Sequence, residues 1–330
     1  MSGAGMATGR AEALSALTTG DRFVLATHEH PDGDAIGSLL ALGWLLESLG
    51  KEVVVHVGPD DLPLPYEYDW LDVSGVQTEI PDDLDDRTVV LLDCGNAERC
   101  SLVAADDLPA NLVNIDHHHD NTLFGSVNFV DSDASCTAEI VWELAGEMGA
   151  TLDRPVAEAL YVGLVTDTGR FMYSNTDARS HRMATELLET GIDHNLIYRR
   201  IYERLPDPKL KLFARGLSAV QRPLDGALTV SVLTSADFAE TGASADHTEG
   251  IVDFLRAVDG TRAAALVREL GEQAPGEWRV SLRSSDGTVD VSKIAREGGG
   301  GGHPAAAGFR TTLAPDELLA FLRDQVAEQL

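Results

Sequence analysis

The sequence predicts an α/β protein in two parts: an N-terminal doubly wound parallel sheet and a smaller C-terminal α/β domain. In the first half, short apolar runs alternate with helical patterns, as expected for strands joined by crossover helices. A second set of strand and helix patterns begins near residue 222. The chain has 330 residues, 44% of them apolar, which suits about two domains that each bury a core.

The first-half strands are four short apolar runs. They cover residues 22–27, 52–57, 88–92 and 111–115. Residues 35–49 are apolar almost all round, which predicts a deeply packed helix that ends at Gly50. Further helices are expected at residues 137–148 and after a cap at Asp153. Such an alternation predicts a parallel sheet.

The second half begins with a connector. Residues 199–221 are more basic than their surroundings and contain Pro206 and Pro208, so we expect a partly helical link between domains. The elements expected beyond it are strands at 228–234, 262–270 and 277–284, and helices at 248–258 and 315–330. The predicted domains are therefore 1–198 and 222–330, joined by 199–221.

The charge is strongly acidic. There are 25 Lys and Arg residues against 54 Asp and Glu, a formal net charge of −29. Such a chain is poorly suited to follow a long polyanion or to bind an anionic membrane surface. Residues 256–310 are different, because eight basic and seven acidic residues give this segment a charge of +1. If the protein binds an anion, this segment is one place to look.

The sequence also indicates in which cellular compartment the protein is expected. We find no uncharged apolar run of the length a membrane helix needs, and residues 1–10 lack the pattern of a secretory signal. The three cysteines, Cys94, Cys100 and Cys136, form no CxxC pair and are too few for a disulfide scaffold. We expect a cytoplasmic protein.

Acidic and histidine residues follow three of the four first-half strands. The first strand leads into His28, Asp32 and Asp34, the third into Asp93, and the fourth into Asp116, His117 and His118. Ligands of open α/β sheets bind at the carboxyl ends of the strands, so these clusters should converge. Mixed nitrogen and oxygen donors suit Mn²⁺ and similar divalent ions, and two such ions can activate a water molecule against a phosphorus atom.

Ordinary loop roles are the alternative for these residues. Single Asp or His residues after strands are usually turn or capping residues, and we expect that role for Glu29, His30, His119 and Asp120. Burying several carboxylates at one sheet edge without a cation would be costly. This cost favours a metal site for the remaining set.

At this point the residues resemble a known family, the DHH phosphoesterase superfamily. The four motifs that carry the resemblance are His28-x3-Asp32-x-Asp34-x2-Gly37-Ser38, Asp93, Asp116-His117-His118 and Gly163-x3-Asp167-Thr168-Gly169. The segment GGGHPAAAG at 300–308 resembles the GGGHxxAAG signature of the DHH-associated C-terminal domain. The match spans nearly the whole chain in order. The size resembles the branch that cleaves very short RNA and 3′-phosphoadenosine 5′-phosphate (pAp).

The resemblance implies a role for each ligand. His28 and Asp32 would hold one Mn²⁺, with Mg²⁺ and Co²⁺ as alternatives. Asp34, His117 and Asp167 would hold a second ion, and Asp93 would bridge the two. His118 would face the substrate and donate a proton, and Asp116 would orient a histidine. Asp167 follows a predicted helix, so the strand ends alone do not indicate it.

The glycine run has two interpretations. Five glycines usually form a flexible linker, but glycines also let backbone N–H groups approach an anion. The family resemblance favours a phosphate site at Gly300, Gly301 and Gly302, with His303 contacting the substrate. Arg283 is the best candidate to clamp a terminal phosphate, with a surface arginine as the alternative. Further substrate contacts are expected from Arg170 and from Ser38 at the start of the first helix.

We therefore expect a metal-dependent phosphoesterase whose two domains close around the substrate. A hydroxide bridging the metals would hydrolyse oligoribonucleotides of about two to five nucleotides, or remove the 3′-phosphate of pAp. Such partners are short RNA or small nucleotides, not long duplexes or membranes, and the protein would be a monomer or homodimer. The alternatives are a phosphodiesterase for cyclic di-AMP or linear pApA, a pyrophosphatase, and a non-enzymatic nucleotide sensor.

Overall fold

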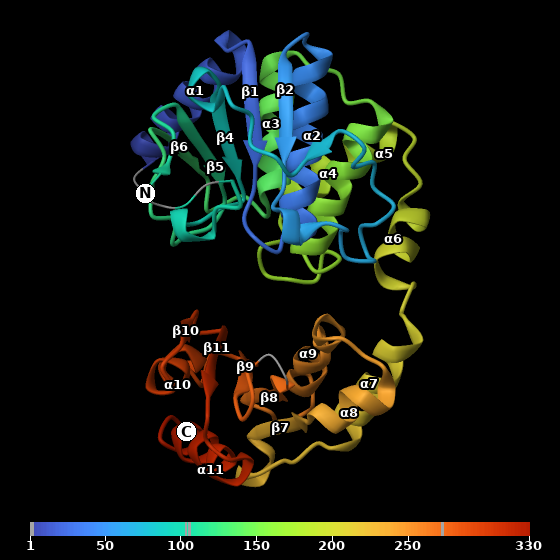
Figure 1. Cartoon of the computed structure of the whole chain (residues 1–330), viewed down its shortest axis with the longest axis vertical. Helices are drawn as coiled ribbons and strands as arrows, with labels where there is room; N and C mark the ends of the chain where they lie inside the picture. Colours follow the sequence, from blue (N-terminus) through green and yellow to red (C-terminus); the bar gives the residue numbers. More distant parts are fainter. Residues whose placement is uncertain (1–2, 103, 105–106, 272–273) are drawn as a thin grey trace. The chain divides into compact units, whose positions relative to one another are not determined.

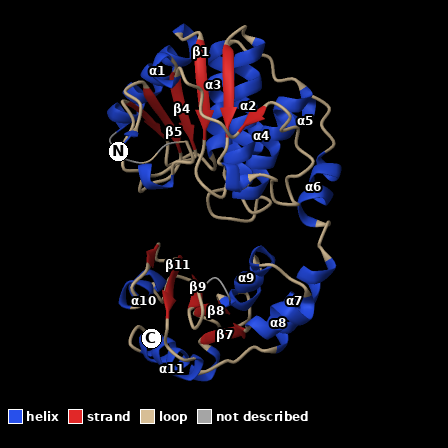
Figure 2. Cartoon of the chain, in the orientation of Figure 1, coloured by secondary structure: helices blue, strands red, loops and turns tan. Residues whose placement is uncertain are grey.

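The structure is a computed structural model that describes residues 3–102, 104, 107–271 and 274–330. The chain forms two compact units, Met1–Arg204 and Leu205–Leu330 (Figure 1). The division falls inside residues 199–221, the segment expected to connect the domains. Each unit contains its own sheet (Figure 2).

The first unit is built on six parallel strands in the order β3-β2-β1-β4-β5-β6. Their bounds are β1 Arg22–Ala26, β2 Glu52–His56, β3 Val76–Gln77, β4 Thr88–Leu92, β5 Leu112–Asp116 and β6 Val127–Val130. The predicted parallel α/β sheet is confirmed. The strand order is that of a doubly wound sheet, and it reverses between β1 and β4. Ligands of such sheets bind outside the carboxyl ends of the strands at this reversal.

The helices of the first unit lie on one side of the sheet, where α1, α2 and α3 contact the strands and α4, α5 and α6 pack mainly on other helices. They are α1 Gly3–Thr19, α2 Gly33–Ser48, α3 Thr137–Met148, α4 Arg154–Asp167, α5 Ala178–Glu189 and α6 His194–Tyr202. All six contribute to one core cluster with Phe23 and Leu25 of β1. The described residues packed on the opposite face lie in loops and short turns, including Leu84, Leu102 and Phe124. The helical cover is therefore one-sided, because the connections from β4 to β5 and from β5 to β6 contain no α-helix in their described parts.

Glycines allow α2, α3 and α4 to approach one another closely. A Cβ on Gly37 of α2 would lie 2.4 Å from the carbonyl oxygen of Ala159 in α4. A Cβ on Gly163 of α4 would lie 2.6 Å from Cβ of Ala138 and 2.7 Å from Oδ1 of Asp34. Any larger residue would push these helices apart, so the two glycines help to set the position of Asp34.

The second unit has a mixed five-stranded sheet in the order β10-β11-β9-β8-β7. Its strands are β7 Leu228–Leu233, β8 Ala263–Glu269, β9 Trp278–Ser284, β10 Gly301–Gly302 and β11 Ala306–Thr311. Its helices are α7 Asp207–Ser218, α8 Ser235–Thr241, α9 Ile251–Arg256, α10 Val291–Glu297 and α11 Pro315–Ala327. One core lies between the sheet and helices α10 and α11, and another lies toward α7 and α9. The smaller α/β domain is thus confirmed. None of the helices described is both long and apolar enough to cross a membrane.

Candidate active site

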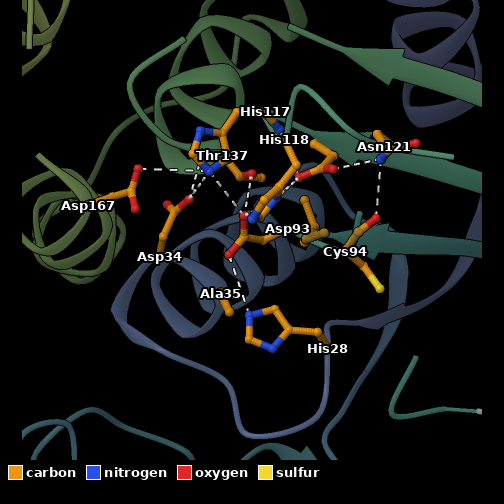
Figure 3. Close-up of polar contacts among 12 residues, drawn as sticks. His28, Asp34, Ala35, Asp93, Cys94, His117, His118, Asn121, Thr137 and Asp167 are labelled. Carbon is orange, nitrogen blue, oxygen red and sulfur yellow. Dashed lines mark hydrogen bonds and ion pairs between the residues drawn. The ribbon is translucent and has the colours of Figure 1, made fainter. Parts of the chain in front are cut away.

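Acidic and histidine side chains meet where the strand order reverses. His28 follows β1 and Asp93 follows β4, and these two strands are neighbours in the sheet. Asp116 is the last residue of β5, and His117 and His118 come directly after it. Figure 3 shows His28, Asp34, Asp93, His117, His118 and Asp167 around one centre. The convergence expected from the strand ends is what the structure shows.

The N-terminus of α2 supplies two aspartates. Asp32 caps the helix, and its Oδ1 accepts hydrogen bonds from the backbone N–H groups of Asp34 at 3.0 Å and Ala35 at 3.1 Å. Asp34 is fully buried and accepts from the backbone N–H groups of Thr137 at 2.6 Å and Ala138 at 2.9 Å, at the start of α3. Both carboxylates are therefore held by helix N-termini, where negative charge is favoured.

Asp167 reaches the same centre from the last turn of α4. The side-chain amide of Asn175 donates to its carbonyl oxygen at 3.1 Å and to Oδ2 at 3.3 Å. Oδ2 lies 3.8 Å from Nε2 of His117. Asp167, at the end of a helix, thus joins a group of acidic and histidine side chains whose other members follow strands or begin a helix.

The potential ligands form two groups on either side of Asp93, which also forms a group with His117 and His118. His28, Asp32 and Asp93 make one group, and Asp34, His117 and Asp167 make the other, with the donor atoms of each group within 4.8 Å of one another. Oδ2 of Asp93 lies 3.7 Å from Nε2 of His28, and its Oδ1 lies 3.5 Å from Nε2 of His117. The two oxygens of one carboxylate face the two groups, which is the arrangement of a bridging ligand.

The carboxylates interact strongly. Burial, followed by the charges of Asp93, Asp167 and Asp32, raises the pKa of Asp34 well above its usual value. Burial and neighbouring carboxylates also raise the pKa of Asp167 to about 6, although His117 opposes the shift. Burial would raise the pKa of Asp93 too, but His28, His117 and His118 outweigh it and the pKa is lowered. The histidines thus compensate only part of this negative charge.

The donor set fits divalent metal ions. Nδ1 of His28 lies 2.8 Å from the carbonyl oxygen of Glu29. If Nδ1 carries the proton and donates it to this hydrogen bond, Nε2 is unprotonated, faces Asp93 and is able to coordinate a metal ion. The guanidinium of Arg99 also lies 3.0 Å from this Nδ1, and because a guanidinium only donates, it hydrogen-bonds Nδ1 only in the other tautomer. Imidazole and carboxylate donors without thiolate suit Mn²⁺, Mg²⁺ and related ions better than a structural zinc site. A cation would also satisfy the clustered carboxylates.

His118 is held by Asp116 beside the two groups. Its Nδ1 donates to Oδ1 of the fully buried Asp116 at 2.7 Å and lies 3.6 Å from Oδ1 of Asp93. Burial would lower the pKa of His118, but Asp116 and the nearby carboxylates raise it to about 9. At neutral pH this imidazole is therefore protonated.

Three polar residues absent from the sequence prediction support the centre. The hydroxyl of Thr137 donates to Oδ1 of Asp93 at 3.0 Å. The amide of Asn121 donates to Oδ2 of Asp116 at 2.6 Å and to Oδ1 of Asn114 at 2.7 Å. Asn114 in turn donates to the carbonyl oxygen of Cys94 at 3.1 Å, next to Asp93. Of the three, only Asn114 could have been noticed in the sequence, because it is a polar residue in the middle of an apolar strand.

Two predicted substrate contacts in this unit have different surroundings. Arg170 is exposed three residues after Asp167, with its guanidinium 5.0 Å from the ring centre of Tyr202. Ser38 is fully buried, and its hydroxyl donates to the carbonyl oxygen of Ala35 at 3.2 Å. This burial corrects the expectation for Ser38, because a side chain inside the packing of α2 cannot reach a substrate.

The glycine run in the second unit forms a hairpin, so the flexible-linker interpretation does not hold. Gly301 and Gly302 of β10 pair with Gly308 and Ala307 of β11. A Cβ on Gly300 would lie 2.2 Å from the carbonyl oxygen of Gly308. The turn between the strands is closed by hydrogen bonds between His303 and Ala306, at 2.8 and 3.1 Å. The hairpin thus presents exposed glycines beside His303.

Arg283 lies next to this hairpin. It is directly opposite Ala306 in the pairing of β9 with β11. Its Nε lies 3.7 Å from Oδ1 of Asp253 in α9, and a third of its side chain is exposed. Arg283 is thus accessible to an anion and only loosely paired with Asp253.

Two known domain families match this chain, one in each of its two units. The sequence profile of the "DHH family, N-terminal domain" matches residues 22–164, and that of the "DHHA1 domain" matches 225–328. A Thermus thermophilus protein named "Bifunctional oligoribonuclease and PAP phosphatase NrnA" is 32% identical over 93% of this chain and 89% of its own length. The Bacillus subtilis protein of that name is 31% identical over 91% of this chain and 92% of its own. The crystal structure of an exopolyphosphatase-related protein from Bacteroides fragilis covers 98% of this chain and 96% of that chain, with a TM-score of 0.87 and 25% identity.

Proposed function

Because this chain belongs to the DHH family, we propose that it is a metal-dependent hydrolase of short oligoribonucleotides and of pAp. The observation that carries the proposal is the pair of ligand groups on either side of Asp93 at the reversal of the strand order. Relatives that match most of the chain are named for both activities. The family resemblance inferred from the motifs is confirmed.

We assign the metal ligands as the family resemblance implies. His28 and Asp32 would hold one ion, Asp34, His117 and Asp167 would hold the other, and Asp93 lies close to both groups. When bound, such ions, which we propose to be Mn²⁺, would supply a water molecule of lowered pKa and polarise the phosphate. The α2 and α3 N-termini fix Asp32 and Asp34 so that the ligands need little rearrangement.

His118 acts as the proton donor in this proposal. Asp116 fixes Nδ1, so the proton on Nε2 is the one available to a phosphate oxygen or to the leaving oxygen. The raised pKa of about 9 keeps that proton in place at neutral pH. Asp116 is a positioning residue, because it acts through His118.

The second unit supplies the anion-binding groups. Arg283, His303 and the glycines of the hairpin contact a terminal phosphate of the substrate, and Arg170 of the first unit is a further contact. A net charge of −29 disfavours long RNA, whereas a few positive groups are enough for a short nucleotide. We propose substrates of about two to five nucleotides on this ground. The cytoplasmic location and the choice between monomer and homodimer stay predictions.

A hydrolysis panel tests the proposal. The substrates are 5′-phosphorylated RNA of two, five and about twenty nucleotides, pAp, cyclic di-AMP, linear pApA and pyrophosphate, in Mn²⁺. We expect fast turnover of the shortest RNAs and of pAp, slow turnover of the long RNA, and a loss of about a thousandfold or more in Asp93→Asn. The matched control is Asp133→Asn, which removes an exposed carboxylate that follows β6 and is outside both ligand groups.

Other outcomes would redirect the assignment. A preference for cyclic di-AMP or pApA would change the substrate and keep the metal ligands. Binding of nucleotides without turnover of any phosphate compound would contradict the enzyme and favour a sensor.

A further inference from the structure

Three arginines stand side by side on neighbouring strands of the second unit. Arg279 of β9 lies directly opposite Arg268 of β8 on one side and Arg310 of β11 on the other. Because directly paired residues point to the same face of a sheet, the three side chains share one face. We call Arg268, Arg279 and Arg310 the arginine row.

The arginine row is accessible, and the acidic residue whose charge acts on it, Asp246, raises the pKa of Arg268 without forming an ion pair. Arg279 and Arg310 are exposed, and Arg268 is partly buried. Among the residues that the structure describes, no carboxylate forms an ion pair with any of the three. This is unusual in a chain with 54 acidic residues, in which most other arginines have a carboxylate neighbour.

The row is unfavourable without a ligand. Like charges directly opposite each other destabilise a sheet. Burial and the charges of Arg279 and Arg310 lower the pKa of Arg268, although the charge of Asp246 opposes the shift. Arg268 thus lies beside two like charges that Asp246 offsets only in part. A bound anion would relieve this repulsion, and arginine is the residue best suited to phosphate.

The row lies on the same face as Arg283. Residues 279, 281 and 283 of β9 point to one side of the sheet, because side chains alternate along a strand. Arg283 is four positions after Arg279, which places the row roughly 13 Å along the strand from the proposed site of the terminal phosphate. Between them lie Ser281 and its partner Gly308, two small and partly exposed residues, while Leu266 on the other side of Ser281 is buried.

We propose that the arginine row binds the phosphodiester groups of the substrate farther from the terminal phosphate. The inference rests on the proposed function, because it extends the site of the oligoribonucleotide. Arg283 and the hairpin hold one end, and the surface over Ser281 and Gly308 accommodates the intervening nucleotides. A dinucleotide or pAp is too short to reach the row, so the row favours the longer members of the substrate range.

The test compares two double variants that remove the same charge. One is Arg279→Gln with Arg310→Gln. The control is Arg215→Gln with Arg323→Gln, which changes two half-exposed arginines on helices α7 and α11. The kcat/KM values are measured for 5′-phosphorylated oligoadenylates of two and five nucleotides at several salt concentrations.

We expect the row variant to lower the ratio of kcat/KM for five against two nucleotides roughly tenfold, mainly through KM. For the five-nucleotide substrate, the slope of log KM against log salt concentration should decrease by about 0.7 for each arginine that contacts a phosphate. The control should keep the ratio of the wild type. The row variant should melt no earlier than the wild type, because repulsion has been removed.

The outcomes separate this inference from the proposed function. If the wild type hydrolyses neither oligonucleotide, the proposed function fails. If the wild type hydrolyses both and the two double variants have equal ratios, only the arginine row is contradicted. A row variant that melts earlier and loses activity equally at both lengths would make the row structural and would also overturn the inference.

Discussion

At the scale of single residues, the contact between Asp116 and His118 decides the protonation of the site. The buried carboxylate holds Nδ1 at 2.7 Å, and the pKa of His118 is raised to about 9. A raised pKa means that the protonated form is favoured. A proton donor of this kind is therefore active below about pH 9 and is lost as the pH rises through that value.

Replacing Asp116 tests this role. In Asp116→Asn the neutral amide stabilises the imidazolium less, so the pKa of His118 falls toward its ordinary value near 6.5. We expect the alkaline limb of the kcat profile to move to lower pH, and kcat at neutral pH to fall about 10- to 100-fold. The measurement is pAp hydrolysis between pH 5 and 10 at saturating Mn²⁺.

Asp133→Asn serves as the control, and the alkaline limb of its kcat profile should lie at the same pH as in the wild type. Partial unfolding of Asp116→Asn would lower the rate without moving the limb to that position. An unchanged limb in a folded Asp116→Asn protein would show that His118 does not supply the proton.

Sequence reasoning predicted, for a physical reason, that most residues of the candidate site would lie together. The carboxyl ends of parallel strands meet, so residues that follow predicted strands can be grouped without knowing the fold. Asp167 ends a helix and came only from the family resemblance. Thr137 and Asn121 support the centre through contacts with residues distant in sequence, which no local pattern indicates.

At the scale of elements, the contact between α2 and α4 positions Asp34 and Asp167, two of the proposed metal ligands. Asp34 begins α2 and Asp167 ends α4, so the spacing of these helices sets the distance between the two carboxylates. Gly37 lies where α2 meets α4, and a Cβ there would lie 2.4 Å from a backbone oxygen that cannot rotate away. The glycine is therefore required by packing, not by backbone conformation.

Two alanine substitutions separate packing from helix propensity. Gly37→Ala should destabilise the protein by about 1–3 kcal/mol through overpacking, and should weaken metal binding. Gly146→Ala in α3, where an added Cβ meets nothing within 4 Å, should stabilise it by about 0.5–1 kcal/mol. Urea unfolding of the metal-free proteins measures both changes. Equal effects of the two substitutions would contradict the packing argument.

The elements that could be predicted are those with strong local patterns. The apolar runs gave β1, β2, β4 and β5, with ends that differ by no more than one residue from the structure. Helix α1 was not predicted because its sequence is rich in Gly, Ala and Thr, although Ala13 and Leu17 are fully buried in the core. Its position depends on a tertiary contact, since a Cβ on Gly9 would lie 2.2 Å from the carbonyl oxygen of Asn128 in β6.

At the scale of the whole molecule, acidic and basic residues are distributed unevenly along the chain. The net charge is −29, yet residues 256–310 carry +1. This segment contains Arg283, the glycine hairpin and the arginine row, whereas the first unit concentrates carboxylates for cations. We propose that the carboxylates of the first unit bind cations and the arginines of the second bind phosphate groups, which lets an acidic protein act on a polyanion.

The most direct test of this account is to add Mn²⁺ back to chelated protein while following hydrolysis of a 5′-phosphorylated diribonucleotide. We predict no turnover in the metal-free protein and recovery that saturates at two Mn²⁺ per chain in the wild type, with no recovery in Asp93→Asn. Turnover that persists without metal, or that stays absent at every Mn²⁺ concentration, would contradict the two-metal phosphoesterase.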